Sequence, residues 1–305
     1  MKLVSFAHAG TTAFGIADGS AIALPAPDFL ADYPTLRAVI ADPDGLERLR
    51  AELTASSARL AFADIDLLPP IVDPAKVICI GINYETHRSE TGRSASAYPA
   101  VFLRFSDTQI GHGTPIVRPR ASTALDYEGE LAVIIGRPGR AIAQADALEH
   151  VAGYACYNDA SIRDWQRHTH QFTPGKNFPQ TGAFGPWLVT ADELDDPTNL
   201  RLVTRLNGMV VQAATTADMI FSIADIIAYV STFTPLAAGD VIATGTPGGV
   251  GFKREPPLWM RPGDVVEVEI DGIGTLRNVI VDEADAVRRA QGTEISANSW
   301  LADVR

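Results

Sequence analysis

Cysteine is scarce in this chain, whose 305 residues contain only Cys79 and Cys156. Two thiols cannot form the disulfide framework of a small secreted protein, and they cannot complete a zinc ribbon. Both lie among apolar or aromatic neighbours (VICIG and YACYN), so we expect reduced core residues. A chain of this length can bury a core large enough to fold without a disulfide or a structural metal.

Long hydrophobic runs are also missing. No stretch of about 18 apolar residues occurs. The start of the chain, MKLVSFAHAGTTAF, lacks the sustained apolar segment of a secretion signal. Hydrophobic residues nevertheless make up 46% and charged residues 20% of the chain, as in ordinary globular proteins. We therefore expect a soluble, cytoplasmic protein.

Basic residues are outnumbered by acidic ones. The 25 Lys and Arg against 37 Asp and Glu give a formal charge of −12. Such a surface repels nucleic-acid phosphates and anionic lipids, so we expect neither a nucleic acid nor a membrane as partner. A small anionic substrate would need a strongly positive local site.

Two regions of different pattern are present. Residues 1–24 contain short apolar bursts separated by Gly, Asp and Ser, which predict an antiparallel meander, and residues 34–58 carry leucines at helical spacing. Three prolines in LLPPIVDPAK (67–76) indicate a linker, because proline fixes φ and removes a hydrogen-bond donor. We predict a small N-terminal α+β module over 1–72 and a larger catalytic domain over 73–305.

The larger region is rich in short runs of Val, Ile and Leu that are typical of strands. These runs are VICIGI (77–82), AVFLRF (100–105), ELAVIIG (130–136), LRLVTRL (200–206), DVIATG (240–245) and DVVEVEI (264–270). Helical stretches are fewer, at YETHRSET (84–91), ADALEHVAG (145–153), IRDWQRHT (162–169), FSIADIIAYVSTF (221–233) and EADAVRRAQ (283–291). Because strands and helices do not alternate regularly, we predict an α+β fold with a mixed, rolled or barrel-like β structure.

The segment DYEGELAVIIG (126–136) contains two glutamates at strand spacing. Residues two apart on a strand point to the same side, so Glu128 and Glu130 would present two carboxylates together. Such close like charges favour a cation between them. The alternative is a solvent-facing strand edge on which both glutamates are harmless.

A third carboxylate follows an apolar strand in YACYNDASIRDWQ (154–166). Asp159 could complete an oxygen site for Mg²⁺ or Mn²⁺, with other positions left to water and substrate. The alternative is that Asp159 or Ser161 caps the helix that starts there. Zinc is disfavoured, because no paired His or Cys ligands lie nearby.

Two further segments carry possible acid–base groups. A helix over GINYETHRSET (81–91) places His87 and Glu90 on one face, where the pair could activate a water; an incidental surface contact is the alternative. The segment QFTPGKNFPQTGAFGPWLVT (171–190) looks irregular because of its glycines and prolines. Its single basic residue, Lys176, is either solvated or folds over an anion.

The order of these motifs is more specific than any one of them. The succession IGINYETH, DYEGELAVIIG, GYACYNDASIRDWQ, PGKNFPQTGAFGPWLVT, GDVIATGTPGGVG and GDVVEVEIDGIGTLRN resembles the fumarylacetoacetate hydrolase family. The resemblance covers about residues 76–281. The N-terminal residues resemble the smaller, more variable module of longer bacterial members.

The resemblance implies a mixed β-sandwich roll, a homodimer, and bound Mg²⁺ or Mn²⁺. Matched residue by residue, it implies metal ligands at Glu128, Glu130 and Asp159, catalytic roles for His87, Glu90 and Lys176, and substrate contacts from Arg163, Gln166 and Thr246. One departure is visible, since Arg104 stands where many members have lysine. We expect this change to affect the edge of the pocket and not the metal site.

The implied function is hydrolysis of the C3–C4 bond of a 2,4-diketo acid, such as an acylpyruvate, a fumarylpyruvate-like compound or a 2,4-diketo-3-deoxy sugar acid. The small anionic substrate would yield pyruvate or another 2-oxo acid and a carboxylic acid. In this hypothesis His87, steered by Glu90, deprotonates the attacking water, and Lys176 stabilises the oxyanion. The alternatives are an oxaloacetate decarboxylase, a keto–enol isomerase or hydratase, and a non-catalytic metal-binding relative.

Overall fold

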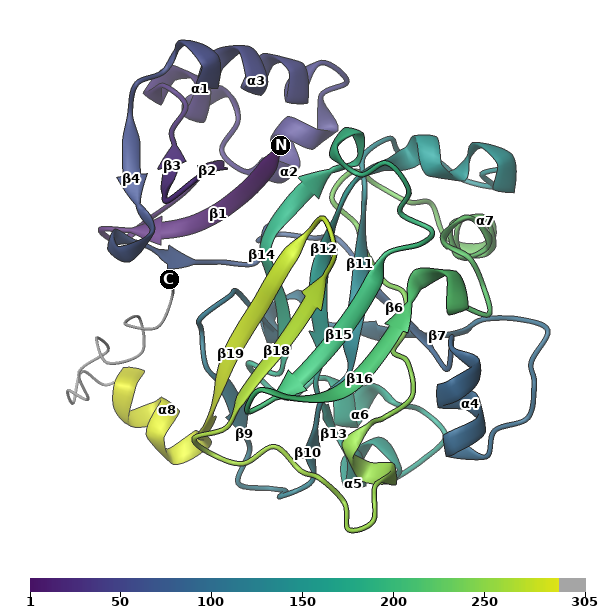
Figure 1. The fold of residues 1–305 in the computed structure, drawn as a ribbon. Helices are drawn as coiled ribbons and strands as arrows, with labels where there is room; N and C mark the ends of the chain where they lie inside the picture. Colours follow the sequence, from purple (N-terminus) through teal and green to yellow (C-terminus); the bar gives the residue numbers. More distant parts are fainter. Residues whose placement is uncertain (291–305) are drawn as a thin grey trace.

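Two β-sheets packed face to face form the body of the molecule (Figure 1). The computed structural model describes residues 1–290, with the backbone alone for Ala55 and residues 287–290. The larger sheet contains, in spatial order, β4 (Arg59–Ala61), β3 (Ala21–Ala23), β2 (Thr11–Asp18), β1 (Lys2–His8), β14 (Gly182–Thr190), β12 (Val151–Asp159), β11 (Gly129–Ile135), β17 (Val241–Ala243), β6 (Val77–Gly81) and β7 (Ala100–Arg104). Two short strands extend it, β5 (Asp66–Leu67) beside β1 and β8 (Gln109–Ile110) beside β14.

The second sheet contains five strands and covers one face of the first. Its spatial order is β16 (Met209–Thr215), β15 (Arg201–Leu206), β18 (Val265–Ile270), β19 (Gly274–Asp282) and β9 (Ile116–Arg118). A separate pair joins β10 (Leu125–Asp126) to β13 (Ser161–Ile162). Both sheets contain parallel and antiparallel neighbours, and in residues 1–290 the end strands β4 and β7 do not pair with each other. The fold is therefore the predicted mixed α+β sandwich, and the large sheet stays open instead of closing into a barrel.

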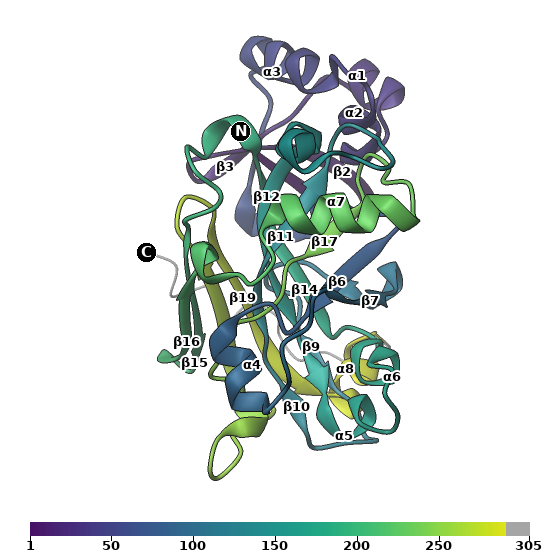
Figure 2. The same ribbon diagram turned by 90° about the vertical axis from the view of Figure 1, so that its right-hand side faces the viewer.

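Helices lie around the two sheets (Figure 2). The α-helices are α1 (Pro27–Asp32), α2 (Leu36–Ala41), α3 (Gly45–Ala55), α4 (Glu85–Thr91), α5 (Arg163–Gln166), α6 (Thr173–Lys176), α7 (Ile223–Phe233) and α8 (Glu283–Ala290). Helices α2 and α3 pack against a face of the larger sheet. Short 3₁₀ helices are η1 (Phe62–Asp64), η2 (Ser106–Thr108), η3 (Gln144–His150), η4 (Ala191–Glu193), η5 (Thr216–Asp218) and η6 (Gly251–Lys253). None of the helices within residues 1–290 has both the length and the apolar character needed to cross a membrane.

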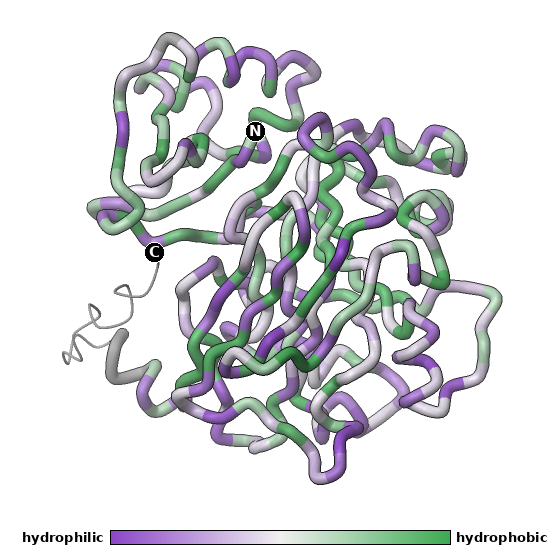
Figure 3. The backbone as a smooth tube through the Cα atoms, viewed as in Figure 1, coloured by the Kyte–Doolittle hydropathy of each residue, from purple (hydrophilic) through white to green (hydrophobic). Residues whose placement is uncertain are grey.

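Strand β11 shows why the central run of the sequence is continuously hydrophobic. Its alternate residues Leu131 and Val133 pack in the core between the two sheets, whereas Ala132 and Ile134 pack in a second core against the N-terminal helices. A strand covered on both faces has no solvent side, so every residue of β11 is buried. By contrast, the strands of the front sheet in Figure 3 alternate between green and purple, as expected for a sheet with one face away from the core.

The N-terminal residues form the predicted meander and helices, but they do not form a sheet of their own. Strand β1 pairs antiparallel with β14, so the N-terminal strands extend the large sheet. The predicted domain boundary at residue 72 stays a prediction, and one sheet contains strands from both sides of it.

Three local predictions are wrong. The segment 171–190 is not irregular throughout, because Gly182–Thr190 forms the nearly fully buried strand β14 between β1 and β12. The helix expected over 145–153 is the 3₁₀ helix η3, and β12 begins at Val151. The helix expected over 162–169 is limited to the four residues of α5. Of the helix expected over 283–291, the last residue lies outside the described part.

The predicted core cysteines are confirmed. Cys79 lies in β6 and Cys156 in β12, and both are buried free thiols.

Candidate active site

Three carboxylates meet where β11 and β12 lie side by side. Gly129 is the register partner of Asn158, and the Asp159 amide donates to the carbonyl oxygen of Glu128 at 2.8 Å. Opposite residues of an antiparallel pair face the same side, so Asp159 points where Glu128 and Glu130 point. Ligand oxygens of the three carboxylates lie within 4.8 Å of one another, and all three residues are buried. The solvent-facing alternative for the glutamates is therefore wrong.

The electrostatics of the three carboxylates favour a bound cation. Burial raises the pKa of Glu130 well above its usual range, and Asp159 and Glu128 raise it further. Burial also opposes ionisation of Glu128, but Arg163 and Lys176 outweigh it and lower the pKa of Glu128 to about 2. A hard divalent cation would offset the repulsion among these negative charges, and three carboxylates are the oxygen ligands that suit Mg²⁺ or Mn²⁺.

Lys176 lies directly on this site. Its Nζ donates to Glu128 Oε2 at 2.5 Å and to Asp159 Oδ2 at 2.6 Å, and the side chain is 1% exposed. Burial alone would lower the pKa of Lys176, but Asp159 and Glu128 raise it, so the amine stays charged. A Cβ on Gly175 would lie 2.4 Å from the backbone nitrogen of Gln166, so only glycine lets α6 pack this tightly on α5. The alternative of a solvated lysine is therefore wrong.

Arg104 also reaches the carboxylate cluster. Its Nη1 donates to Asp159 Oδ1 at 2.6 Å, and its Nη2 donates to Thr181 Oγ1 at 2.7 Å. Arg104 is buried at the end of β7, at the position where the family resemblance implies a lysine. Our expectation that this change affects only the edge of the pocket is wrong, because the guanidinium binds a predicted metal ligand.

His87 and Glu90 form the predicted pair on α4. His87 Nδ1 lies 2.7 Å from Glu90 Oε1, and Glu90 Oε2 accepts from the Gly249 amide at 2.9 Å. With Nδ1 engaged, His87 Nε2 remains for the cavity that the ring lines. The chain enters α4 through Ile82, a β-branched residue at φ 58°, which marks a locally strained turn. His87 is buried, so an incidental surface contact is excluded.

Arg163 connects the carboxylates to the predicted substrate-binding residues. It donates from Nε to Asp126 Oδ2 at 2.8 Å and from Nη1 to Gln166 Oε1 at 2.9 Å, and Nη1 also lies 2.7 Å from Glu128 Oε1. The Thr246 hydroxyl donates to the Gly129 carbonyl and accepts from Gln212 Nε2. It therefore braces the strand that carries the glutamates.

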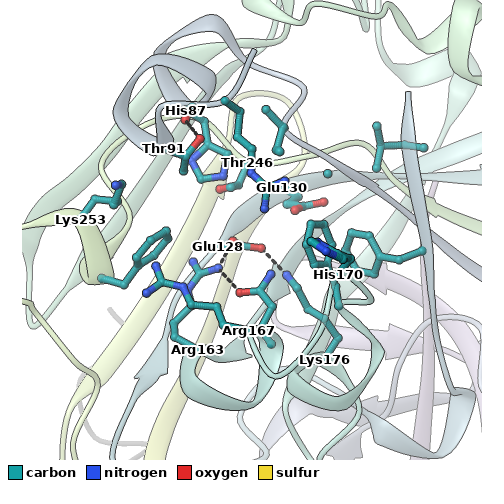
Figure 4. A pocket seen from close by; sticks show the side chains of 18 of the residues that line it. His87, Thr91, Glu128, Glu130, Arg163, Arg167, His170, Lys176, Thr246 and Lys253 are labelled. Carbon is teal, nitrogen blue, oxygen red and sulfur yellow. Dashed lines mark hydrogen bonds and ion pairs between the residues drawn. The ribbon is translucent and has the colours of Figure 1, made fainter. Parts of the chain in front are cut away.

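These side chains surround one cavity of about 500 Å³ (Figure 4). Seven predicted residues line it: His87, Glu128, Glu130, Arg163, Gln166, Lys176 and Thr246. Glu90 and Asp159 do not line the cavity. Glu90 is hydrogen-bonded to His87, and Asp159 is hydrogen-bonded to Lys176. The structure thus brings all nine predicted residues into one assembly, while their individual roles stay predictions.

Sequence reasoning missed several residues of this assembly. Asp126 is fully buried, and its carboxylate accepts from Arg163 and from the amides of Gly251 and Phe252. The sequence could have indicated Asp126, because it lies two positions before Glu128, just as Glu128 lies two positions before Glu130. Arg167 and Lys253 also line the cavity, and no local motif indicated that these distant residues converge.

Comparison with known proteins agrees with this assembly. Residues 76–281 match the family model described as fumarylacetoacetate (FAA) hydrolase C-terminal. The chain belongs to this family, whose model spans every predicted site residue.

Individual relatives carry several activities in their names. The chain is 41% identical to "Oxaloacetate tautomerase fahd2, mitochondrial" of Xenopus laevis over 238 residues, 77% of this chain and 75% of the relative. It is 29% identical to the maleylpyruvate hydrolase of Sphingobium sp. SYK-6, solved with manganese(II) and pyruvate, at a TM-score of 0.77 and coverage of 92% and 99%. It is 32% identical to the 2-hydroxyhepta-2,4-diene-1,7-dioate isomerase of Mycobacterium marinum, at a TM-score of 0.73 and coverage of 93% and 99%.

Proposed function

We propose that the chain is a divalent-metal-dependent enzyme that moves a proton at C3 of a small 2-oxo acid. The observation that carries the proposal is that Glu128, Glu130 and His87 line one cavity, with a carboxylate oxygen of Asp159 within 4.8 Å of oxygens of both glutamates and Glu90 bonded to His87. Glu128, Glu130 and Asp159 would hold the Mg²⁺ or Mn²⁺. When bound, the ion would supply positive charge that makes the C3 protons of a chelated 2-oxo acid more acidic.

The chain's own residues divide the remaining work. His87 would take the C3 proton of the keto form at Nε2 and return it to the enolate oxygen, or carry out the reverse transfer, while Glu90 holds the Nδ1 proton and orients the ring. Gln166, whose Oε1 is occupied by Arg163, would turn its amide NH₂ toward the substrate. Lys176 would keep the carboxylates ionised and stabilise negative charge that develops on the substrate.

Keto–enol tautomerisation of a 2-oxo acid such as oxaloacetate is the first candidate reaction. It needs only a base that removes and returns one proton, which the His87–Glu90 pair can do. The 41% identity to an oxaloacetate tautomerase supports this choice over decarboxylation.

Hydrolysis of the C3–C4 bond of a 2,4-diketo acid is the second candidate. It uses the same cation and additionally requires an activated water, for which the His87–Glu90 pair is again suited. The structural likeness to a maleylpyruvate hydrolase supports it. For either reaction we propose a homodimer, which size-exclusion chromatography with light scattering tests.

One assay separates the candidates. The purified protein is given Mg²⁺ or Mn²⁺ and either enol-oxaloacetate or an acylpyruvate, and loss of the enol absorbance and release of pyruvate are followed in parallel. Tautomerisation predicts loss of the oxaloacetate enol without pyruvate release. Hydrolysis predicts stoichiometric pyruvate from the acylpyruvate. Failure of both reactions with either metal contradicts the proposal.

A further inference from the structure

The cavity wall contains more Lys and Arg side chains than pair with the carboxylates of the site. Two of the five Lys and Arg side chains in the wall, Arg163 and Lys176, pair with buried carboxylates. The other three, Arg93, Arg167 and Lys253, are exposed, and no ion pair of theirs occurs among residues 1–290. We call these three residues the outer rim. A chain with a net charge of −12 thus gathers uncompensated cations at this cavity.

Two rim cations crowd around one aromatic ring. The guanidinium carbons of Arg167 and Arg163 each lie 4.4 Å from the ring centroid of Phe252, and Lys253 Nζ lies 5.6 Å from it. The ring offsets only part of the repulsion among like charges brought this close. A bound anion would relieve the rest. Arg163 joins this group directly to Glu128 of the metal site.

Arg163 supplies an independent sign that a ligand belongs here. Its side chain is 3% exposed, and its Nη2 is buried without a hydrogen-bond partner, although Nε and Nη1 are both engaged. A buried guanidinium donor without a partner is costly, so such groups are normally satisfied by protein, water or ligand. Figure 4 shows Lys253 at one side of the cavity and His170 at the other, with Glu128 between them.

We propose that Arg167 and Lys253, with Arg163, form a subsite for a second carboxylate at the far end of the substrate. The enzyme then selects 2-oxo dicarboxylates over 2-oxo monocarboxylates of the same length. This inference rests on the proposed function, because the first carboxylate and the 2-oxo group are assigned to the cation. Arg167 and Lys253 are specificity-determining residues and take no part in proton transfer.

The test compares ligands that differ only in the terminal group. The pairs are oxaloacetate with 2-oxobutyrate, and 2-oxoglutarate with 2-oxopentanoate. Dissociation constants are measured on the Mn²⁺-loaded full chain by titration calorimetry or by water proton relaxation, so turnover is not needed. The variants are Arg167→Gln, Lys253→Gln and the double variant, and Arg140→Gln is the matched control at an exposed arginine outside the cavity.

We expect at least one dicarboxylate to bind about tenfold or more tightly than its partner, as a charge-assisted hydrogen bond provides. Arg167→Gln and Lys253→Gln should each reduce this preference several-fold, and the double variant should abolish it. Monocarboxylate affinities should stay within about twofold, and Arg140→Gln should change neither. Because the rim is exposed, raising the salt concentration should weaken the preference.

The inference is overturned if the variants keep the preference, or if they weaken both members of a pair equally. If no 2-oxo acid binds the Mn²⁺-loaded wild-type protein, the proposed function falls and the inference falls with it. The two failures are therefore distinguishable.

Discussion

The inner and outer ends of the cavity hold their charges in opposite ways. At the inner end, Glu128 and Lys176 are buried in the wall, and Asp159 and Arg104 are buried behind it; hydrogen bonds link Glu128 to Lys176, Lys176 to Asp159 and Asp159 to Arg104. At the outer end, the rim cations Arg93, Arg167 and Lys253 are exposed and have no carboxylate partner in residues 1–290. A buried charge without a partner carries a large desolvation cost, whereas an exposed charge is solvated by water until a ligand binds. The inner end is thus suited to a permanent ion and the outer end to a transient anion.

The largest effect is expected from Asp159→Asn at the inner end. The amide keeps the side-chain volume and removes the charge on which Arg104 and Lys176 depend. Loss of the ligand should reduce turnover about a thousandfold, since a metal contributes several kcal/mol to charge stabilisation. Steady-state kinetics with added Mn²⁺ measures this, and circular dichroism checks the fold. Full activity of the variant after chelation of metal would contradict the role of Asp159.

Substitution of His87 should have the next largest effect. His87→Gln should reduce turnover by about 10²–10⁴-fold, as expected for loss of a general base, without changing Mn²⁺ affinity. Deuterium exchange at the methyl group of pyruvate separates the candidate reactions. If His87 removes the C3 proton, exchange is lost with turnover; if it only activates water, exchange persists. A variant with normal turnover would exclude both roles.

Lys176→Met should separate cation binding from catalysis. Removing a positive charge that contacts Glu128 and Asp159 should tighten Mn²⁺ binding by about tenfold, because the ion no longer competes with an ammonium. Turnover should fall at the same time, because the charge that faces the substrate is lost. Manganese titration and kinetics on one preparation test both effects. Weaker Mn²⁺ binding would show that Lys176 supports the ion instead of competing with it.

The smallest effect is a pH dependence set by Glu130. Burial and the two neighbouring carboxylates raise the pKa of Glu130, so the metal-free protein retains its proton above the usual pH. Stability of the metal-free protein should fall as the pH rises from the usual glutamate value through this raised pKa. Cation binding should release the proton, so Mn²⁺ affinity should increase with pH. Calorimetry in buffers of different ionisation enthalpy detects this proton release; its absence would contradict the assignment.

The sequence was informative where chemistry follows from local spacing. The alternation in DYEGE places Glu128 and Glu130 on one side of a strand, and the helical spacing of His87 and Glu90 brings their side chains to 2.7 Å. Asp159 needed more than spacing, because its position depends on the register between β11 and β12. The order of the motifs supplied that information through the family resemblance.

Features that depend on tertiary packing were missed. The glycines and the proline of β14 concealed a strand that pairs with β1, β12 and β8. Lys176 looked like a loop residue, because its burial depends on the close approach of α6 to α5. Arg167 and Lys253 are 86 positions apart and converge only through the fold around Phe252.

Manganese titration of the wild type and Glu130→Gln, with and without oxaloacetate, followed by electron paramagnetic resonance, tests the central claim most directly. We predict one tightly bound Mn²⁺ per wild-type chain, a change in its spectrum when oxaloacetate is added, and loss of tight binding in Glu130→Gln. Equal Mn²⁺ binding by both proteins, or a spectrum that oxaloacetate leaves unchanged, would contradict the claim that these carboxylates present a cation to a 2-oxo acid.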